Sequence, residues 1–269
     1  MMGVMTVNND FKNHIKKSLD AGVRIDGRKP DEFRPISIEL GVSSTAEGSA
    51  KVTAGDTEVL AGVKMGLGRP FPDRPDDGVL MVNSEMLPMS NPEFEPGPPG
   101  IQSIEVARVI DRGIRESNAF DTKSLCVEKG EKVWMVQCDV LPVNFDGNLL
   151  DLGGLGALAA LLNARFPKLQ EDGTVDYHER TDKPLALQRQ PIPVTVGKIG
   201  DHLLVDLTQQ EEKALDARLT ITMLGDGTIC ALQKGGQASL TDGDIKEMVR
   251  LATVKSQELR AKLAEVTKG

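Results

Sequence analysis

Residues 147–162, with the sequence GNLLDLGGLGALAALL, have the outline of a phosphate-binding turn followed by a helix. Backbone N–H groups at the start of a helix attract anions without help from side chains. The turn, however, contains no Lys, Arg, Ser or Thr, and its only charged residue is Asp151, which would repel a phosphate. The GGLG segment at residues 153–156 falls short of a dinucleotide-binding fingerprint, and close helix packing accounts for its glycines.

Three arginines, Arg108, Arg112 and Arg115, are spaced by four and three residues, so on a helix they lie on one side. Such a row can follow the phosphates of an RNA strand. It can equally be a solvated helix face with internal ion pairs, because acidic residues such as Asp111 stand three or four residues from an arginine. The spacing alone leaves both interpretations open.

Four carboxylates, at Asp206, Glu211, Glu212 and Asp216, could in principle bind Mg²⁺, which prefers oxygen ligands. In the segment DARLTITM, strand alternation would place Asp216 and Arg218 on one face. The cation then stands where a metal site or an acid–base pair needs a second carboxylate. The residues therefore favour a structural ion pair between Asp216 and Arg218.

Other catalytic and metal-binding constellations are not indicated. None of the three histidines is near a Ser or Cys in a nucleophile elbow, so the sequence predicts no catalytic triad. The three cysteines are odd in number and widely spaced, which excludes a disulfide framework and a zinc knuckle. We expect buried thiols of a cytosolic protein, with no metal and no cofactor.

The composition limits the classes of function. The chain has 269 residues, 39% of them hydrophobic, which is enough for one large core or two ordinary domains. Its 40 acidic and 32 basic side chains give a net charge of −8, so any RNA contact must be local. No signal-peptide pattern and no long apolar run occur, and we expect a cytoplasmic protein without a membrane partner.

Hydrophobic patterning predicts a helix, then strands, then a second helix in the first half of the chain. Asn9 is a plausible N-cap for an amphipathic helix with Ile15 and Leu19 on its apolar face. The runs RPISIEL, SAKVTA, TEVLAGVKMG and GVLMVNSEML have period two and predict strands. After a Pro- and Gly-rich stretch, residues 101–120 predict a helix whose apolar face includes Ile104, Ala107, Ile110 and Ile114.

The second half repeats this order. The strand KVWMVQCDVLPV and a helix to about Arg165 precede the strands IPVTVGKI, HLLVDL, ARLTITML and TICALQKG. A last helix starts near Thr241, whose spacing to Asp244 suggests a capping box. We expect an α+β protein with mostly antiparallel sheets packed on helices. Its expected parts are an N-terminal helix and arm (1–27), a first subdomain (28–166), a polar connector (167–189) and a second subdomain with the C-terminal helix (190–265).

Four segments carry a resemblance to a known family: VRIDGRKPDEFRPI (23–36), IEVARVIDRGIRES (104–117), VQCDVLPVNFDGNLLD (136–151) and LGDGTICALQKGG (224–236). They resemble the RNase PH family of phosphate-dependent 3′-to-5′ exoribonucleases, from about Arg24 onward. The resemblance implies an RNase PH-like fold, of the ribosomal protein S5 domain 2-like type, with two βα-rich subdomains. Within the family, the chain is most similar to the non-catalytic RNase PH-like subunit of the archaeal exosome.

The chain departs from active family members at two places. Active members have a Gly-Thr-Arg-Thr turn whose Arg and Thr hold the attacking phosphate. This chain instead has Gly147, Asn148, Leu149 and Leu150. Active members also have an aspartate pair, and here Glu212 stands near the first position and Arg218 at the second. The resemblance therefore implies a degenerate phosphate loop and a degenerate acidic site.

The resemblance implies a structural and RNA-binding role without catalysis by this chain. Its partners would be the catalytic RNase PH-like subunit in a hexameric ring, RNA-binding cap subunits and single-stranded RNA. In the family the arginine helix faces the RNA path, which favours Arg108 and Arg112 as RNA-binding residues, whereas Arg115 could as easily pair with Asp111. The alternative is an active phosphorolytic 3′-to-5′ exoribonuclease, which would need another anion-binding side chain near Asn148.

Overall fold

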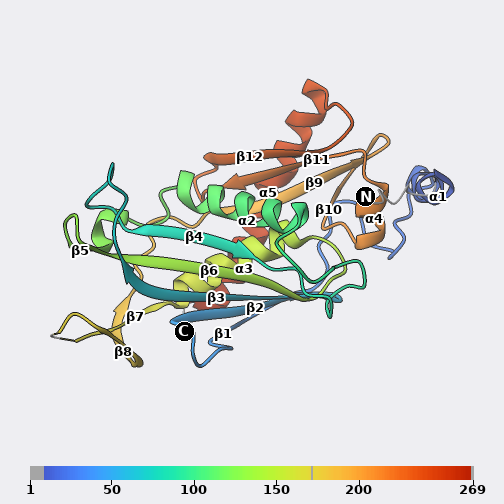
Figure 1. The fold of residues 1–269 in the computed structure, drawn as a ribbon. Coiled ribbons are helices and arrows are strands. Elements are labelled where there is room, and N and C mark those ends of the chain that lie inside the picture. The colour runs from blue at the N-terminus through green and yellow to red at the C-terminus, as the bar shows by residue number, and fades with distance from the viewer. Residues whose placement is uncertain (1–8, 171, 268–269) are drawn as a thin grey trace.

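The computed structural model describes residues 9–170 and 172–267, which form two larger β-sheets with helices between them and a third, two-stranded sheet (Figure 1). The first sheet has six strands. Its order is β1 (Ile36–Leu40), β2 (Gly48–Ala54), β3 (Thr57–Gly68), β6 (Lys132–Asn144) and β4 (Val79–Ser84), and β5 (Cys126–Glu128) also pairs with β6. All neighbours are antiparallel except β4, which runs parallel to β6.

The second sheet has four antiparallel strands. Its order is β10 (His202–Val205), β9 (Ile192–Ile199), β11 (Ala217–Met223) and β12 (Ile229–Gly236). The inner strands β9 and β11 are almost wholly buried, whereas β12 alternates between exposed and half-buried residues. The second sheet therefore has β12 as an accessible edge strand.

Three longer helices join the two sheets. The helix α3 (Leu149–Asn163) packs against β2, β3 and β6 of the first sheet and against β9 of the second. The helix α2 (Ile101–Glu116) contacts β4 and β12, and α5 (Asp242–Thr267) covers β9, β11 and β1. The α+β architecture with mostly antiparallel sheets on helices is therefore confirmed.

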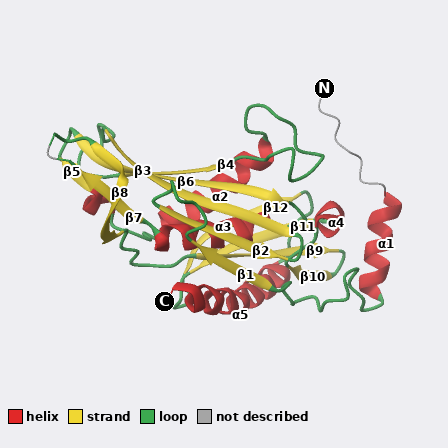
Figure 2. Ribbon diagram, turned by 90° about the horizontal axis from the view of Figure 1, so that it is seen from below, coloured by secondary structure: helices red, strands yellow, loops and turns green. Residues whose placement is uncertain are grey.

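Short helices complete the chain: α1 (Asn9–Asp20), the 3₁₀ helix η1 (Thr122–Leu125) and α4 (Gln209–Ala214). Figure 2 shows α5 along one side of the molecule and α1 at the end opposite to the β7–β8 hairpin. As predicted, Ile15 and Leu19 of α1 are buried, in a small cluster that includes Leu204 and Leu207. The N–H groups of Thr241 and Asp244 each bond the other's side chain, which confirms the predicted capping box before α5.

The helix α3 is buried on every side, because every residue from 149 to 161 lies in the interior. A β-carbon at Gly154 would lie 2.4 Å from Cγ of Pro193, closer than two carbon atoms can approach. The predicted role of this glycine in close helix packing is confirmed. The same contact brings the N-terminal part of α3 close to β9.

The structure adds strands to one predicted segment and corrects one residue of a predicted helix face. The segment predicted as a polar connector, residues 167–189, contains most of a two-stranded hairpin of β7 (Arg165–Leu169) and β8 (Val175–Pro184), which was not predicted from the sequence. β8 is largely exposed and polar, so it lacks the apolar alternation by which a strand is recognised. Ile104 is 48% exposed, because α2 packs through Val106, Val109 and Ile110 instead.

Candidate functional site

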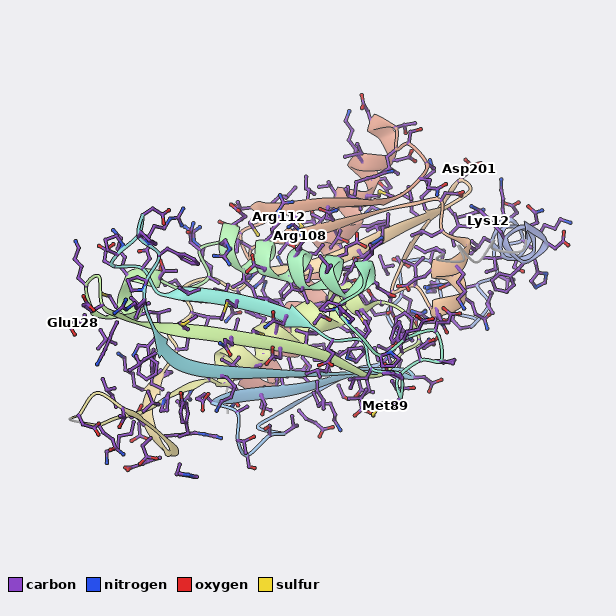
Figure 3. All side chains as sticks on the ribbon, in the orientation of Figure 1. Lys12, Met89, Arg108, Arg112, Glu128 and Asp201 are labelled. Carbon is purple, nitrogen blue, oxygen red and sulfur yellow. The ribbon has the colours of Figure 1, made fainter. Side chains whose placement is uncertain are left out.

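Arg108 and Arg112 lie one turn apart on α2 and are exposed to solvent. Figure 3 labels both side chains on the side of α2 that faces β12. They line a groove of about 290 Å³ with Ile104 of α2 and Gln233 of β12. Within residues 9–170 and 172–267 neither guanidinium forms a hydrogen bond or ion pair. Both cations are therefore available to an anionic ligand.

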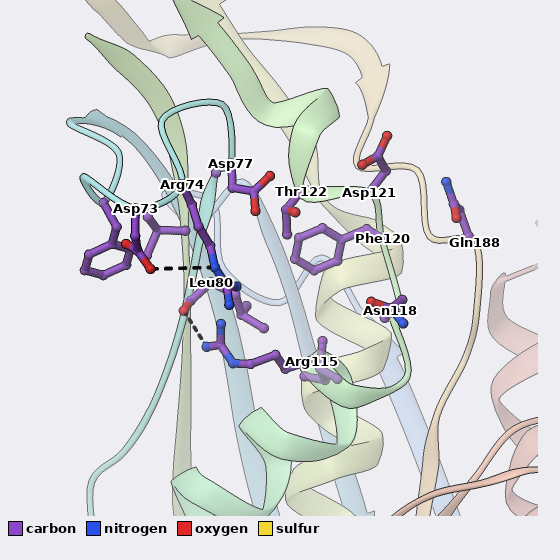
Figure 4. Close-up of a pocket in the computed structure, with 15 residues that line it drawn as sticks. Asp73, Arg74, Asp77, Leu80, Arg115, Asn118, Phe120, Asp121, Thr122 and Gln188 are labelled. Carbon is purple, nitrogen blue, oxygen red and sulfur yellow. Dashed lines mark hydrogen bonds and ion pairs between the residues drawn. The ribbon is translucent and has the colours of Figure 1, made fainter. Parts of the chain in front are cut away.

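Arg115 is placed differently from the other two arginines. It forms two hydrogen bonds with Asp111, at 3.0 and 2.6 Å, and donates a third to the carbonyl oxygen of Leu80 at 3.0 Å. The hydrogen bond with Asp111 raises the pKa of Arg115 although partial burial opposes this. Its side chain faces another cavity, of about 760 Å³, which also contains Arg74 (Figure 4). The predicted pairing of Arg115 with Asp111 is thus present in the structure.

The turn before α3 has two consecutive residues with left-handed backbone conformation, Gly147 and Asn148. Gly147 has φ +84°, and a β-carbon there would lie 2.3 Å from the carbonyl oxygen of Leu207. Asn148 is also left-handed, with φ +58°, and its side-chain amide donates to Asp206 at 2.7 Å. Leu149 and Leu150 are buried. None of these side chains is free to hold a phosphate.

In this turn, the backbone N–H of Asn148 already has a hydrogen-bond acceptor, which is a carboxylate of the chain itself. The N–H of Asn148 donates to Oε1 of Glu212 at 2.8 Å. Burial raises the pKa of Glu212 to about 7, although the hydrogen bond from Asn148 and the charge of Arg218 act in the opposite direction. The backbone donor is therefore already satisfied by an acidic group from α4.

The predicted ion pair between Asp216 and Arg218 was wrong. Asp216 precedes β11 and turns toward α1, where it pairs with Lys12 at 2.6 Å and accepts the N–H of Gly200 at 2.7 Å. Arg218 instead pairs with Glu105 of α2 at 2.8 Å. Its guanidinium lies against Gly235, where a β-carbon would clash with it. Arg218 therefore connects α2 to the second sheet.

The remaining carboxylates are neutralised by arginines of residues 23–35, called the arm from here on, which extends beyond the arm predicted at residues 1–27. Glu211 forms two hydrogen bonds of 2.8 Å with Arg24, and both side chains are buried. Asp206 pairs with Arg28 and Arg34, each at 2.8 Å. Burial acts to raise the pKa of Asp206, but hydrogen bonds and charge from Arg34 outweigh it and lower the pKa.

The described residues contain no group of three or more His, Cys, Asp or Glu arranged to hold a metal. We did not recognise from the sequence several neighbours of the site, namely Glu105, Gln233 and the arginines of the arm. A usable signal existed for α4, because Thr208 and Glu211 form a capping box with the Thr-x-x-Glu spacing. Nothing comparable in the sequence indicates the contact between Glu105 and Arg218.

Two family models match the chain in sequence order. They are domain 1 of the 3′ exoribonuclease family, RNase PH, over residues 32–167 and domain 2 over residues 189–255. The chain belongs to this family. The RNase PH-like fold expected from the sequence resemblance is thereby confirmed.

Archaeal relatives of this family member match over nearly the full chain. The exosome complex component Rrp42 of Methanopyrus kandleri is 43% identical over 250 residues, which cover 93% of this chain and 94% of the relative. The Rrp42 of Methanothermobacter thermautotrophicus is 46% identical over 237 residues, 88% of each chain.

Solved structures of archaeal exosomes also match. A chain of the Archaeoglobus fulgidus exosome with RNA bound to the active site has a TM-score of 0.88 and 42% identity, covering 94% of this chain and 98% of that one. A chain of an archaeal exosome core has a TM-score of 0.83 and 40% identity, with 95% and 96% covered. No described helix of this family member is long and apolar enough to cross a membrane.

Proposed function

We propose that this chain is a non-catalytic, RNA-binding subunit of an archaeal-type exosome, a complex that degrades and processes RNA from the 3′ end. The observation that carries the proposal is the turn at residues 147–150, whose one side-chain donor, the amide of Asn148, is bonded to Asp206 and whose Asn148 N–H is bonded to Glu212. The high similarity to Rrp42 components over most of the chain supports the same assignment.

Charge and chemistry at the turn support the proposed absence of catalysis. A phosphorolytic enzyme must hold a phosphate beside the RNA 3′ end, and Leu149 and Leu150 offer no hydrogen-bond donor. Glu212, whose pKa is raised to about 7, adds negative charge to the turn when it is ionised. Arg218 stands where active members have an acid, and it is held by Glu105. A phosphate in this turn would meet repulsion without compensating contacts.

The chemistry would then belong to a catalytic RNase PH-like partner in a hexameric ring, with RNA-binding cap subunits on the ring, acting in the cytoplasm. In this arrangement Arg108 and Arg112 bind successive phosphates of a single-stranded RNA and hold it near the active site of the neighbour. Arg115 contributes to the stability of α2 through Asp111 and does not contact RNA.

The decisive experiment compares the purified chain with its complex. The chain alone is incubated with single-stranded RNA, with and without phosphate, and release of nucleoside diphosphates is measured. We expect none, and we expect phosphate-dependent release once the catalytic subunit is added. The catalytic subunit alone serves as the control. Phosphate-dependent release by the isolated chain would instead favour the alternative, an active exoribonuclease.

A second experiment tests assembly. Light scattering after size-exclusion chromatography measures the mass of the chain alone and of its mixture with the catalytic subunit. We expect a stable hetero-oligomer, because exposed strand edges and apolar side chains such as Ile101, which is 75% exposed, need covering. A chain that remains a monomer in the mixture contradicts a role as ring subunit.

A further inference from the structure

A second basic cavity lies apart from the groove of Arg108 and Arg112 and shares no lining residue with it. Its volume is about 530 Å³. Three segments line it: the chain at residues 187–190, the turn between β11 and β12, and the side chain of Arg260 on α5. Its charged side chains are Arg189, Arg260 and Asp226, so its net charge is positive.

Neither arginine of this cavity is neutralised by a carboxylate. Arg189 donates to the carbonyl oxygen of Ser117 at 3.2 Å. Arg260 donates to the carbonyl oxygens of Gln190 at 2.8 Å and Met223 at 3.2 Å, and its buried Nε–H has no acceptor in the described part of the chain. By contrast, the buried Arg24 and Arg34 each form an ion pair with a carboxylate.

The half-buried Arg260 guanidinium has no ion-pair partner among the described residues, which is costly for a charged group, whereas Arg189 is exposed to solvent. Burial lowers the pKa of Arg260, and the charge of Asp226 offsets this only in part. The carboxylate of Asp226 already accepts the N–H of Thr228 at 2.9 Å within the turn. The carbonyl contacts hold both arginine side chains in place, so a ligand that binds them loses little side-chain entropy. The two side chains are thus held in place at the wall of one cavity.

We propose that Arg189 and Arg260 form a binding site for a phosphate group. Guanidinium groups match phosphate oxygens in geometry and charge, and two of them can share one group. The phosphate could be a free anion, such as pyrophosphate, or a phosphodiester of an RNA strand that continues beyond the α2 groove. The site does not depend on the proposed lack of catalysis, because none of its residues belongs to the turn at residues 147–150.

Calorimetric titration of pyrophosphate into the full chain tests the site. We expect Arg189→Gln to weaken binding about tenfold, because a charge-assisted hydrogen bond is lost. Asp226→Asn should tighten binding, since it removes the one carboxylate that lines the cavity while an amide oxygen can still accept the N–H of Thr228. Arg250→Gln is the control for loss of a positive charge, because Arg250 is exposed on α5 and does not line the cavity. Its pyrophosphate affinity should equal that of the unaltered chain.

Competition with a hexauridylate RNA separates the two sources of phosphate. Displacement of pyrophosphate by the RNA assigns the site to the RNA backbone, and simultaneous binding assigns it to free anions; either result supports the site. Absence of pyrophosphate binding overturns the proposal. The proposal is also overturned if Arg189→Gln and Asp226→Asn both bind pyrophosphate as the unaltered chain does, while the double variant Arg108→Gln/Arg112→Gln no longer binds it. Because Asp226 is exposed, its variant keeps the test valid if Arg189→Gln does not fold.

Discussion

Asp151 is the most unusual residue near the turn before α3. It is fully buried in the first turn of the helix, and neither oxygen accepts a hydrogen bond of normal geometry. Burial raises the pKa of Asp151 to about 7, although nearby Thr195 and Asn148 partly offset it. The folded protein therefore binds a proton here that an unfolded aspartate releases near pH 4.

This proton predicts how Asp151→Asn depends on pH. Between about pH 4 and pH 7 the native state binds more protons at this residue than the unfolded state, so its contribution to stability falls as pH rises through that window. The amide of an asparagine at this position does not titrate, so its contribution to stability does not depend on pH. From pH 5 to pH 8, the stability of Asp151→Asn relative to the unaltered chain should therefore rise by about 2 to 3 kcal/mol.

Urea denaturation at the two pH values measures this difference. Asp201→Asn is the control, because Asp201 is exposed, and its relative stability should change little between pH 5 and pH 8. A relative stability of Asp151→Asn that is independent of pH would show that the carboxyl group is ionised in the folded protein throughout.

Among the elements, the arm at residues 23–35 has no helix or strand of its own and is held by buried charges. Arg24 is 2% exposed and forms two hydrogen bonds of 2.8 Å with Glu211, while Asp26 lies at 4.0 Å. Arg24→Ala leaves the buried Glu211 carboxylate without its partner, which should lower the free energy of unfolding by about 3 to 5 kcal/mol. Chemical denaturation measures the loss.

The matched comparison is Lys168→Ala. Lys168 pairs with Glu179 at the same distance, 2.8 Å, but both side chains are more than half exposed. Its removal should cost less than about 1 kcal/mol. If Arg24→Ala and Lys168→Ala lowered the free energy of unfolding equally, burial would not determine how much an ion pair of the arm stabilises the protein.

The glycines of α3 provide a second prediction at this scale. A β-carbon at Gly154 would lie 2.4 Å from Pro193, whereas one at Gly156 would lie 3.4 Å from Ala61, an ordinary contact. Gly154→Ala should therefore destabilise the protein by about 1 to 3 kcal/mol through overpacking. Gly156→Ala should stay within about 1 kcal/mol, because Ala is the better helix former. Thermal unfolding of both variants gives the comparison, and equal melting temperatures would contradict the packing argument.

The sequence predicted the elements whose signals are local. Period-two runs located most strands, and the spacing of Thr241 to Asp244 located the start of α5. The contacts of the degenerate site were not predictable in this way. Asn148 and Glu212 are 64 residues apart, and only the packing of α4 against the turn brings them together. β8 was missed because its polar, exposed residues carry no burial pattern.

For the whole molecule, the position of α2 connects the fold to RNA binding. Its inner side, with Val106, Ile110 and Ile114, belongs to the core. Its outer side places Arg108 and Arg112 in the groove beside β12. With a net charge of −8, the molecule as a whole repels RNA, so binding depends on such local cations. Loss of a few cations should therefore have a measurable effect.

The last prediction concerns Arg108→Ala combined with Arg112→Ala in the assembled complex. If each arginine contacts one phosphate of a single strand, log Kd should depend less steeply on log salt concentration, with the slope reduced by roughly 0.7 per contact. RNA affinity should fall, and degradation should slow most at low RNA concentration, while the phosphate requirement and the mass of the complex stay the same. Arg115→Ala is the matched control from the same helix, because Arg115 is tied to Asp111 and should leave the salt dependence unchanged. Fluorescence anisotropy over a series of salt concentrations measures the slopes. Unchanged RNA binding and turnover in an intact complex would reduce Arg108 and Arg112 to solvated residues of a structural helix.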